Sequence, residues 1–210
     1  MKTSLALYAY IYKPLEEHLE DDKFEVIYYS LEMAPELLFA KLLSLHIFYT
    51  YGVEISTKEL LSRKKNYTLP EEYLQLVIES MDWLKKVESK VTVYDKGLNA
   101  ESLYASLAKE LSKRGEFKEM EKRKIYVPNN PDKIILVVID HLSLVKASNG
   151  RKLKEEMDLI SSYLVTLRNM CGISPLVLMQ ANRESSSMER RKENMSNLTV
   201  NDTKDSGSPK

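Results

Sequence analysis

Nearly continuous apolar runs in this chain predict buried strands. Residues 24–29 and 134–140 are rich in β-branched and aromatic side chains, and similar short runs occur at 91–95 and within 174–183. Runs of this length and composition are typical of strands that are covered on both faces. Such strands favour a parallel sheet joined by crossover helices.

Between these runs, apolar residues recur every three or four positions, which predicts helices. The predicted helices cover 3–20, 34–52, 56–65, 69–89, 99–115 and 151–172. Pro14 should kink or end the first helix near its own position, because proline has no N–H to donate. The segment 69–89 is predicted to form one long helix. Since helices alternate with strands, the sequence predicts an α/β fold with a mainly parallel sheet.

Two polar segments interrupt this pattern. Residues 116–132 are charged and then rich in proline and asparagine, which indicates a surface excursion. Residues 182–210 are polar and have no periodic apolar face, so we expect a long loop or a disordered tail there. The ordered domain is therefore predicted to cover residues 1–181.

Composition and charge narrow the functional classes. The 210 residues suffice for one domain, and 31 basic residues balance 31 acidic ones, so nucleic-acid binding would need local clusters of charge. The one cysteine, Cys171, excludes an internal disulfide and suits a reducing cytosol; we expect a buried, unreactive thiol. No apolar run approaches the roughly 20 residues of a membrane span, and no signal peptide is recognisable. We therefore expect a cytoplasmic protein without membrane partners.

Three of the predicted strands lead into polar side chains at their carboxyl ends, namely Glu32, Asp140 and Gln180. Open α/β sheets bind ligands at this edge. There, Asp140 can hold the Mg²⁺ of a nucleotide, Glu32 can polarise a water for attack on phosphorus, and Gln180 can sense a γ-phosphate. Taken singly, Asp140 and Gln180 could equally be turn residues. Glu32 could simply be an exposed acid that the dipole of the next helix stabilises.

The first residues resemble the end of a phosphate-binding loop. In the pattern G-x-x-x-x-G-K-[ST], glycines precede the Lys so that backbone N–H groups can surround phosphates. Lys2 and Thr3 precede a helix rich in small apolar residues, and Met1 stands where the last glycine would be. An amine, a hydroxyl, a base, a metal carboxylate and an amide on one sheet edge would form a nucleotide-hydrolysing site.

Four motifs occur together in one order: "SLEM" at 30–33, "VVIDHLSL" at 137–144, "QANR" at 180–183 and "KDSGS" at 204–208. In this combination the chain resembles the RecA-like ATPase domain of DnaB-type replicative hexameric DNA helicases. The resemblance covers nearly the whole chain, although 53–90 and 116–132 match poorly. It implies a RecA-like P-loop NTPase core that uses ATP and Mg²⁺.

The resemblance assigns a role to each candidate site residue. Lys2 is implied to be the phosphate-loop lysine, and Thr3 and Asp140 the residues that hold Mg²⁺. Glu32 is implied to activate water, and Gln180 to sense the γ-phosphate. The family usually has tyrosine after the metal aspartate, where this chain has His141; we expect a packed turn histidine there.

The family grips single-stranded DNA with two loops. The first corresponds to 141–154, which contains no acidic residue and four cations: Lys146, Arg151, Lys152 and Lys154. The second corresponds to 184–208, where Lys204, Asp205, Ser206 and Gly207 resemble residues that contact phosphates. Neither loop contains an aromatic residue, so binding should not depend on DNA sequence.

The implied activity is that of an ATP-driven helicase, a hexamer in its full-length form, which works with a primase or a helicase loader. The chain departs from the family in lacking the phosphate-loop glycines and the strand before them, and in stopping at Lys210 before the family's last strands. It therefore resembles an internal piece of the domain, and we expect the printed chain to hydrolyse ATP poorly or not at all.

Two other interpretations stay open. One is a RecA-type recombinase ATPase, against which "SLEM" and "KDSGS" count. The other is a non-catalytic fragment that binds only DNA or a partner.

Overall fold

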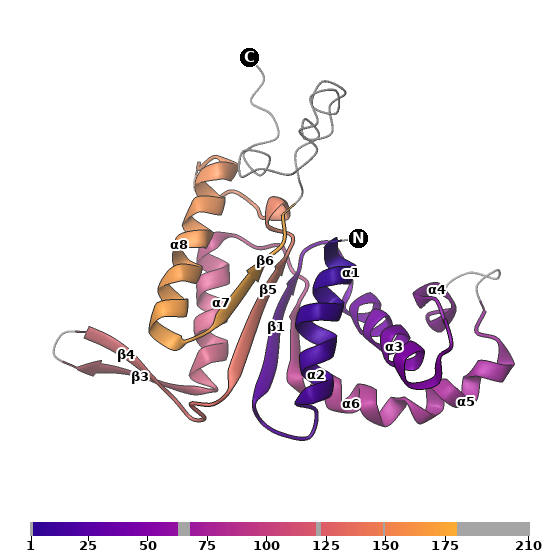
Figure 1. Ribbon diagram of the computed structural model, residues 1–210. Helices are drawn as coiled ribbons and strands as arrows, with labels where there is room; N and C mark the ends of the chain where they lie inside the picture. The colour runs from indigo at the N-terminus through magenta and orange to yellow at the C-terminus, as the bar shows by residue number, and fades with distance from the viewer. Residues whose placement is uncertain (1, 63–67, 121–122, 149, 180–210) are drawn as a thin grey trace, which may run out of the picture.

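The computed structural model describes residues 2–62, 68–120, 123–148 and 150–179. It contains a four-stranded parallel sheet in the order β2-β1-β5-β6. The strands are β1 (Phe24–Ser30), β2 (Val91–Tyr94), β5 (Ile134–Asp140) and β6 (Ser174–Val177). Helices cover both faces of this sheet (Figure 1). The predicted α/β class and parallel sheet are therefore confirmed.

The first face of the sheet is covered by helices from the N-terminal half of the described chain. They are α1 (Lys2–Ala6), a π-helix η1 (Leu7–Tyr12), α2 (Lys13–Glu17), α3 (Pro35–Tyr51) and α6 (Met81–Lys90), with α4 (Thr57–Leu60) and α5 (Glu71–Glu79) farther from the sheet (Figure 1). The second face is covered by α7 (Ala100–Ser112) and α8 (Leu153–Cys171).

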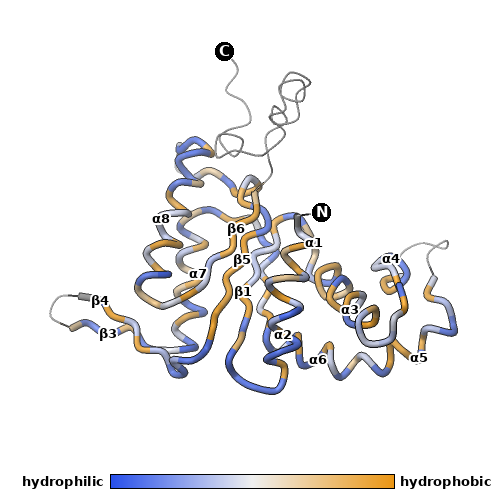
Figure 2. Tube along the Cα trace, viewed as in Figure 1, coloured by the Kyte–Doolittle hydropathy of each residue, from blue (hydrophilic) through white to orange (hydrophobic). Residues whose placement is uncertain are grey.

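Alternate side chains of the two central strands enter two separate cores. Val26 and Tyr28 of β1 pack in the first core, whereas Ile27 and Tyr29 pack in the second. Neighbouring residues of β5 divide in the same way, and Figure 2 shows hydrophobic residues along both strands. This two-sided burial explains why the strands read as continuous apolar runs.

The register of β1 and β5 aligns their carboxyl ends. Phe24 pairs with Ile134 at one end, and Ser30 pairs with Asp140 at the other. Beyond the last pair, the Leu31 N–H donates to the carbonyl oxygen of Asp140 at 2.8 Å. The residues that follow these two strands therefore lie at one sheet edge.

The first helix differs from the prediction at Pro14. The backbone runs through this proline without a break, from α1 through the π-helical η1 into α2, where Pro14 lies in the first turn. At the junction the Lys13 N–H donates to the carbonyl oxygen of Tyr8, five residues earlier. A change from π- to α-helical pairing leaves one carbonyl without an N–H partner, which is where a proline is tolerated.

The predicted single helix over 69–89 is two helices, α5 and α6, which meet at Ser80. The Ser80 hydroxyl donates to the carbonyl oxygen of Leu76 at 2.8 Å, and such a bond from a serine side chain often bends a helix. Two apolar residues of α5, Leu74 and Ile78, are exposed.

The segment at 116–132 contains a β-hairpin that the sequence did not reveal. Strands β3 (Gly115–Met120) and β4 (Arg123–Pro128) pair antiparallel, and they project from the side of the domain (Figure 1). A Cβ at Gly115 would lie 2.5 Å from the carbonyl oxygen of Val127, so the close approach of the strands requires glycine there.

β6 is shorter and more exposed than the predicted buried strand, because it lies at one edge of the four-stranded sheet. Within the described ranges, no helix combines the length and the hydropathy that crossing a membrane requires. The predicted loop or tail over 182–210 lies outside the described residues.

Candidate functional site

The carboxyl edge of the sheet brings Thr3, Glu32 and Asp140 together. Asp140 is the last residue of β5 and is 2% exposed. α1 begins beside this end of the sheet (Figure 1), and the Thr3 hydroxyl donates to Asp140 Oδ1 at 3.4 Å. These two residues, to which the resemblance gives a shared role in holding Mg²⁺, lie 137 positions apart in sequence and are in contact.

A buried tyrosine holds the other oxygen of the same carboxylate. The Tyr28 hydroxyl donates to Asp140 Oδ2 at 2.6 Å. Burial raises the pKa of Tyr28 far above its usual value, and the hydrogen bond and negative charge of Asp140 raise it further. The phenol therefore remains a proton donor at every physiological pH. The sequence analysis missed this residue, although a tyrosine hydroxyl in a buried strand needs a partner.

Glu32 follows β1 by two residues and has a side chain that is 59% exposed. The bend that carries it is held by the Ser30 hydroxyl, which donates to the carbonyl oxygen of Met33 at 2.6 Å. Glu32 Oε2 lies 3.9 Å from Nε2 of His141, too far for a hydrogen bond. The Glu32 carboxylate is therefore exposed to water at the carboxyl edge of the sheet, near Asp140.

His141 is enclosed rather than presented to solvent, as the sequence led us to expect. Its side chain is 15% exposed, and its Nδ1 is buried without a hydrogen-bond partner among the described residues. The peptide bond between Asp140 and His141 is cis.

The donor set at this edge fits Mg²⁺. Carboxylate and hydroxyl oxygens are hard ligands, and Mg²⁺ in nucleotide sites uses one or two carboxylates together with substrate phosphates and water. Asp140 and Thr3 supply such oxygens side by side. Within the part of the chain that the structure describes, no group of three or more His, Cys, Asp or Glu could hold a metal alone, so a metal here would need the phosphates.

The structure describes only some of the remaining predicted site residues. Lys2 is the first residue of α1. Gln180 follows the last described residue, and the backbone just before it lies at the same edge, because the Leu178 N–H donates to the carbonyl oxygen of Ile139 at 3.0 Å. Gln180, Lys204, Asp205, Ser206 and Gly207 lie outside the described residues.

The segment 141–154 contains no acidic residue, but acids from two neighbouring helices pair with it. Arg151 forms ion pairs with Glu101 of α7 and with Glu156 of α8, the latter at 3.0 Å. Glu156 is fully buried and also accepts hydrogen bonds from the N–H groups of Ala100 and Ser148. Arg151, one of the four cations expected to form a positive patch, is thus paired with two acids, and its guanidinium fastens the loop to two helices.

The pKa values of these acids reflect that arrangement. The Arg151 guanidinium is the main cause that lowers the pKa of Glu101 to about 2. Burial alone would raise the pKa of Glu156, but two backbone N–H donors and Arg151 hold it below the usual value. By contrast, Lys146 and Lys152 are exposed, so these two lysines of the loop face solvent.

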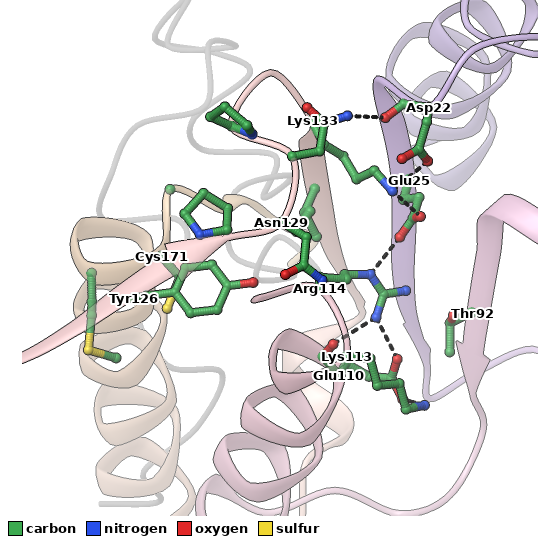
Figure 3. Close-up of a pocket in the computed structure, with 16 residues that line it drawn as sticks. Asp22, Glu25, Thr92, Glu110, Lys113, Arg114, Tyr126, Asn129, Lys133 and Cys171 are labelled. Atoms are coloured by element: carbon green, nitrogen blue, oxygen red, sulfur yellow. Dashed lines mark hydrogen bonds and ion pairs between the residues drawn. The ribbon is translucent and has the colours of Figure 1, made fainter. Parts of the chain in front are cut away.

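A second group of titratable residues lies at the opposite, amino end of the strands. It surrounds a cavity of about 710 Å³ between the start of the sheet, the end of α7 and the hairpin. Figure 3 shows Arg114 between Glu25 and Glu110. The N···O distances from Arg114 to these two carboxylates are 2.5 and 2.7 Å. Lys133 pairs with Glu25 at 2.7 Å, and Lys113 pairs with Glu110 at 2.6 Å.

Asp22 also pairs with Lys133, at 2.5 Å, so three acids balance three bases in this group, which suits a structural role. Burial would raise the pKa of Glu110, yet Lys113, Arg114 and Tyr94 together lower it to about 2. Cys171 also lines the cavity, and burial raises the pKa of its thiol to about 11. The thiol is half-buried rather than buried as expected, and it stays protonated at neutral pH, which is typical of an unreactive cysteine. The candidate site is therefore the carboxyl edge.

Known proteins resemble this chain in sequence and in fold. A family model described as the DnaB-like helicase C-terminal domain matches residues 2–208. One similar structure is described as a DnaB-like replicative helicase and its interactions with primase; it has 17% identity and a TM-score of 0.58 over 87% of this chain. Another is described as an ATPase domain, with 17% identity and a TM-score of 0.59 over 92% of this chain.

The chain spans 38% of the first of these structures and 57% of the second. A search of curated protein sequences gives no match. The two structural similarities confirm the RecA-like fold that the motifs implied.

Proposed function

Because this chain belongs to the family of DnaB-like helicase C-terminal domains, we propose that it is the ATPase core of a replicative DNA helicase. In this role it would couple ATP hydrolysis to movement along single-stranded DNA. The observation that carries the proposal is the contact of the Thr3 hydroxyl with the buried Asp140 carboxylate, beside the open carboxylate of Glu32.

Each residue at the edge has a chemical task that suits its surroundings. Thr3 and Asp140 would hold Mg²⁺, which when bound neutralises phosphate charge. Glu32 is exposed and can accept a proton from a water that is placed for in-line attack on the γ-phosphorus. By the family resemblance, Lys2 and Gln180 would contact the phosphates.

The proposal includes a hexamer in the full-length form and a helicase loader or primase as partner. One structural neighbour is described together with its interactions with primase, which supports that class of partner. We place the protein in the cytoplasm, with the replicating DNA. A nucleotide measurement needs a form that carries a glycine-rich phosphate loop ahead of Lys2, because backbone N–H groups bind the phosphates; we call it the loop-bearing form.

For DNA, the proposal relies on the first loop, 141–154, and on Lys146 and Lys152 within it. Both are exposed, whereas Arg151 is held by Glu101 and Glu156. Two solvent-facing cations with no aromatic neighbour in the loop would contact phosphates without reading bases. The second loop is proposed from its motif alone, on Lys204, Asp205, Ser206 and Gly207.

Replacing Lys152 with Ala should weaken binding to single-stranded oligonucleotides of every sequence and flatten the salt dependence of binding. Each phosphate neutralised on a single strand contributes about 0.7 to the slope of log affinity against log salt concentration. Fluorescence anisotropy of labelled oligothymidine with the loop-bearing form, between low and moderate salt, measures both effects.

Lys118→Ala is the matched control, because this lysine lies on the hairpin strand β3, where it pairs with Glu116. It removes the same charge and should leave the slope unchanged. Arg151→Ala should mainly lower the stability of the fold. An unchanged slope for a folded Lys152→Ala variant would remove the first loop from the proposed DNA site.

A further inference from the structure

We propose that Tyr28 is a positioning residue for the metal site. Its hydroxyl fixes one oxygen of the Asp140 carboxylate so that the other is presented to Mg²⁺ beside Thr3. This inference rests on the proposed function, because it assigns a metal to the carboxyl edge. Tyr28 is 1% exposed, so it would act on the metal site through Asp140.

The position of Tyr28 follows from the pairing of β1 with β5. Ser30 lies opposite Asp140, and Tyr28 lies opposite Val138. Side chains two residues apart in a strand share a face of the sheet, so Tyr28 and Asp140 project into the same core, the one covered by α1 and η1. The long phenol then reaches along β1 to the carboxylate at the end of β5.

The contact divides the two carboxylate oxygens between two hydroxyls. Tyr28 donates to Oδ2 at 2.6 Å, and Thr3 donates to Oδ1 at 3.4 Å. The tyrosine bond is short and buried, because Tyr28 is 1% exposed and Asp140 is 2% exposed. It therefore restricts rotation of the carboxylate, whereas the longer Thr3 contact leaves Oδ1 available to a cation.

Tyr29, the next residue along β1, is a control that distinguishes positioning of the carboxylate from the mere pairing of a buried hydroxyl. Tyr29 is equally buried, but it points to the opposite face, where its hydroxyl bonds to Ser106 of α7 at 2.9 Å. Both Tyr→Phe changes remove one buried hydroxyl from the same strand. Only the change at 28 removes a donor from the carboxylate.

The test measures metal affinity in the loop-bearing form. Electron paramagnetic resonance of free Mn²⁺ gives the affinity for Mn²⁺ in the presence of ATP, without any reading of activity. Groups that orient a metal ligand typically contribute 10- to 100-fold in affinity, so Tyr28→Phe should weaken Mn²⁺ binding by about 10-fold. Tyr29→Phe should leave it within about twofold, with circular dichroism showing both variants folded.

A double-mutant cycle with Asp140→Asn completes the test. If Tyr28 acts through the carboxylate, the change to Phe should have little further effect once Asn replaces Asp140. Equal Mn²⁺ affinity of Tyr28→Phe and Tyr29→Phe would overturn the inference while leaving the proposed function intact. Failure of the unaltered loop-bearing form to bind Mn²⁺ with ATP would instead overturn the proposed function, and this inference with it.

Discussion

The Glu32→Gln variant of the loop-bearing form should lose ATP turnover by about 10²- to 10⁴-fold, which is the usual contribution of general-base catalysis. Gln keeps the size of the side chain but cannot accept a proton. Since Glu32 is 59% exposed and makes no hydrogen bond within the described residues that would hold the fold, stability should change little. Steady-state phosphate release, together with the affinity for a fluorescent ATP analogue, measures the loss.

Glu36→Gln provides the control, because Glu36 is an exposed acid in the first turn of α3, four residues farther along. It should retain full turnover. Nucleotide affinity should be similar in both variants. If Glu32→Gln kept most of its turnover, Glu32 would be an ordinary acidic residue placed favourably before a helix.

The Arg114→Ala variant should lose about 3 kcal/mol of unfolding free energy at pH 7. Removing one partner of a buried ion pair typically costs about 3–5 kcal/mol, and we expect the lower end because two lysines remain beside Glu25 and Glu110. The Arg114 side chain is 15% exposed and that of Glu110 is 3% exposed. Urea unfolding followed by circular dichroism measures the difference.

The pH dependence identifies the cause of that loss. Because the fold lowers the pKa of Glu110 from 4.5 to about 2, its ionised form stabilises the protein above about pH 4.5, and that contribution is lost as pH falls toward 2. The difference between Arg114→Ala and the unaltered chain should therefore narrow in this range. Lys85→Ala breaks an exposed pair with Asp82 and should cost below about 1 kcal/mol. An equal loss for both variants would contradict a structural role for the network.

The strands were predictable from sequence because a buried parallel strand leaves a local pattern. The apolar runs that became β1 and β5 each need cover on both faces, and the structure provides it. The same pattern indicates where the two strands end, so the sequence places Glu32 and Asp140 at one edge of the sheet.

Features that depend on distant partners could not be predicted. Tyr28 meets Asp140 across 112 positions of sequence, and Arg151 meets Glu101 across 50. In sequence the loop 141–154 is therefore a positive patch, because counting charges within the loop misses the acids that neighbouring helices contribute. The π-helical turn before Pro14 and the helix break at Ser80 likewise depend on backbone pairing choices that periodicity does not encode.

Paramagnetic broadening by Mn²⁺ bound with ATP tests the central claim most directly, since it locates the metal. Tyrosine ring signals offer matched probes, because Tyr28 lies beside Asp140 at the carboxyl edge, whereas Tyr126 lines the cavity at the opposite end of the sheet, roughly 20 Å away at about 3.3 Å per strand residue. In the loop-bearing form, we predict strong broadening at Thr3 and Tyr28, and a sharp signal at Tyr126. Broadening at Tyr126 with sharp signals at Thr3 and Tyr28 would contradict the account.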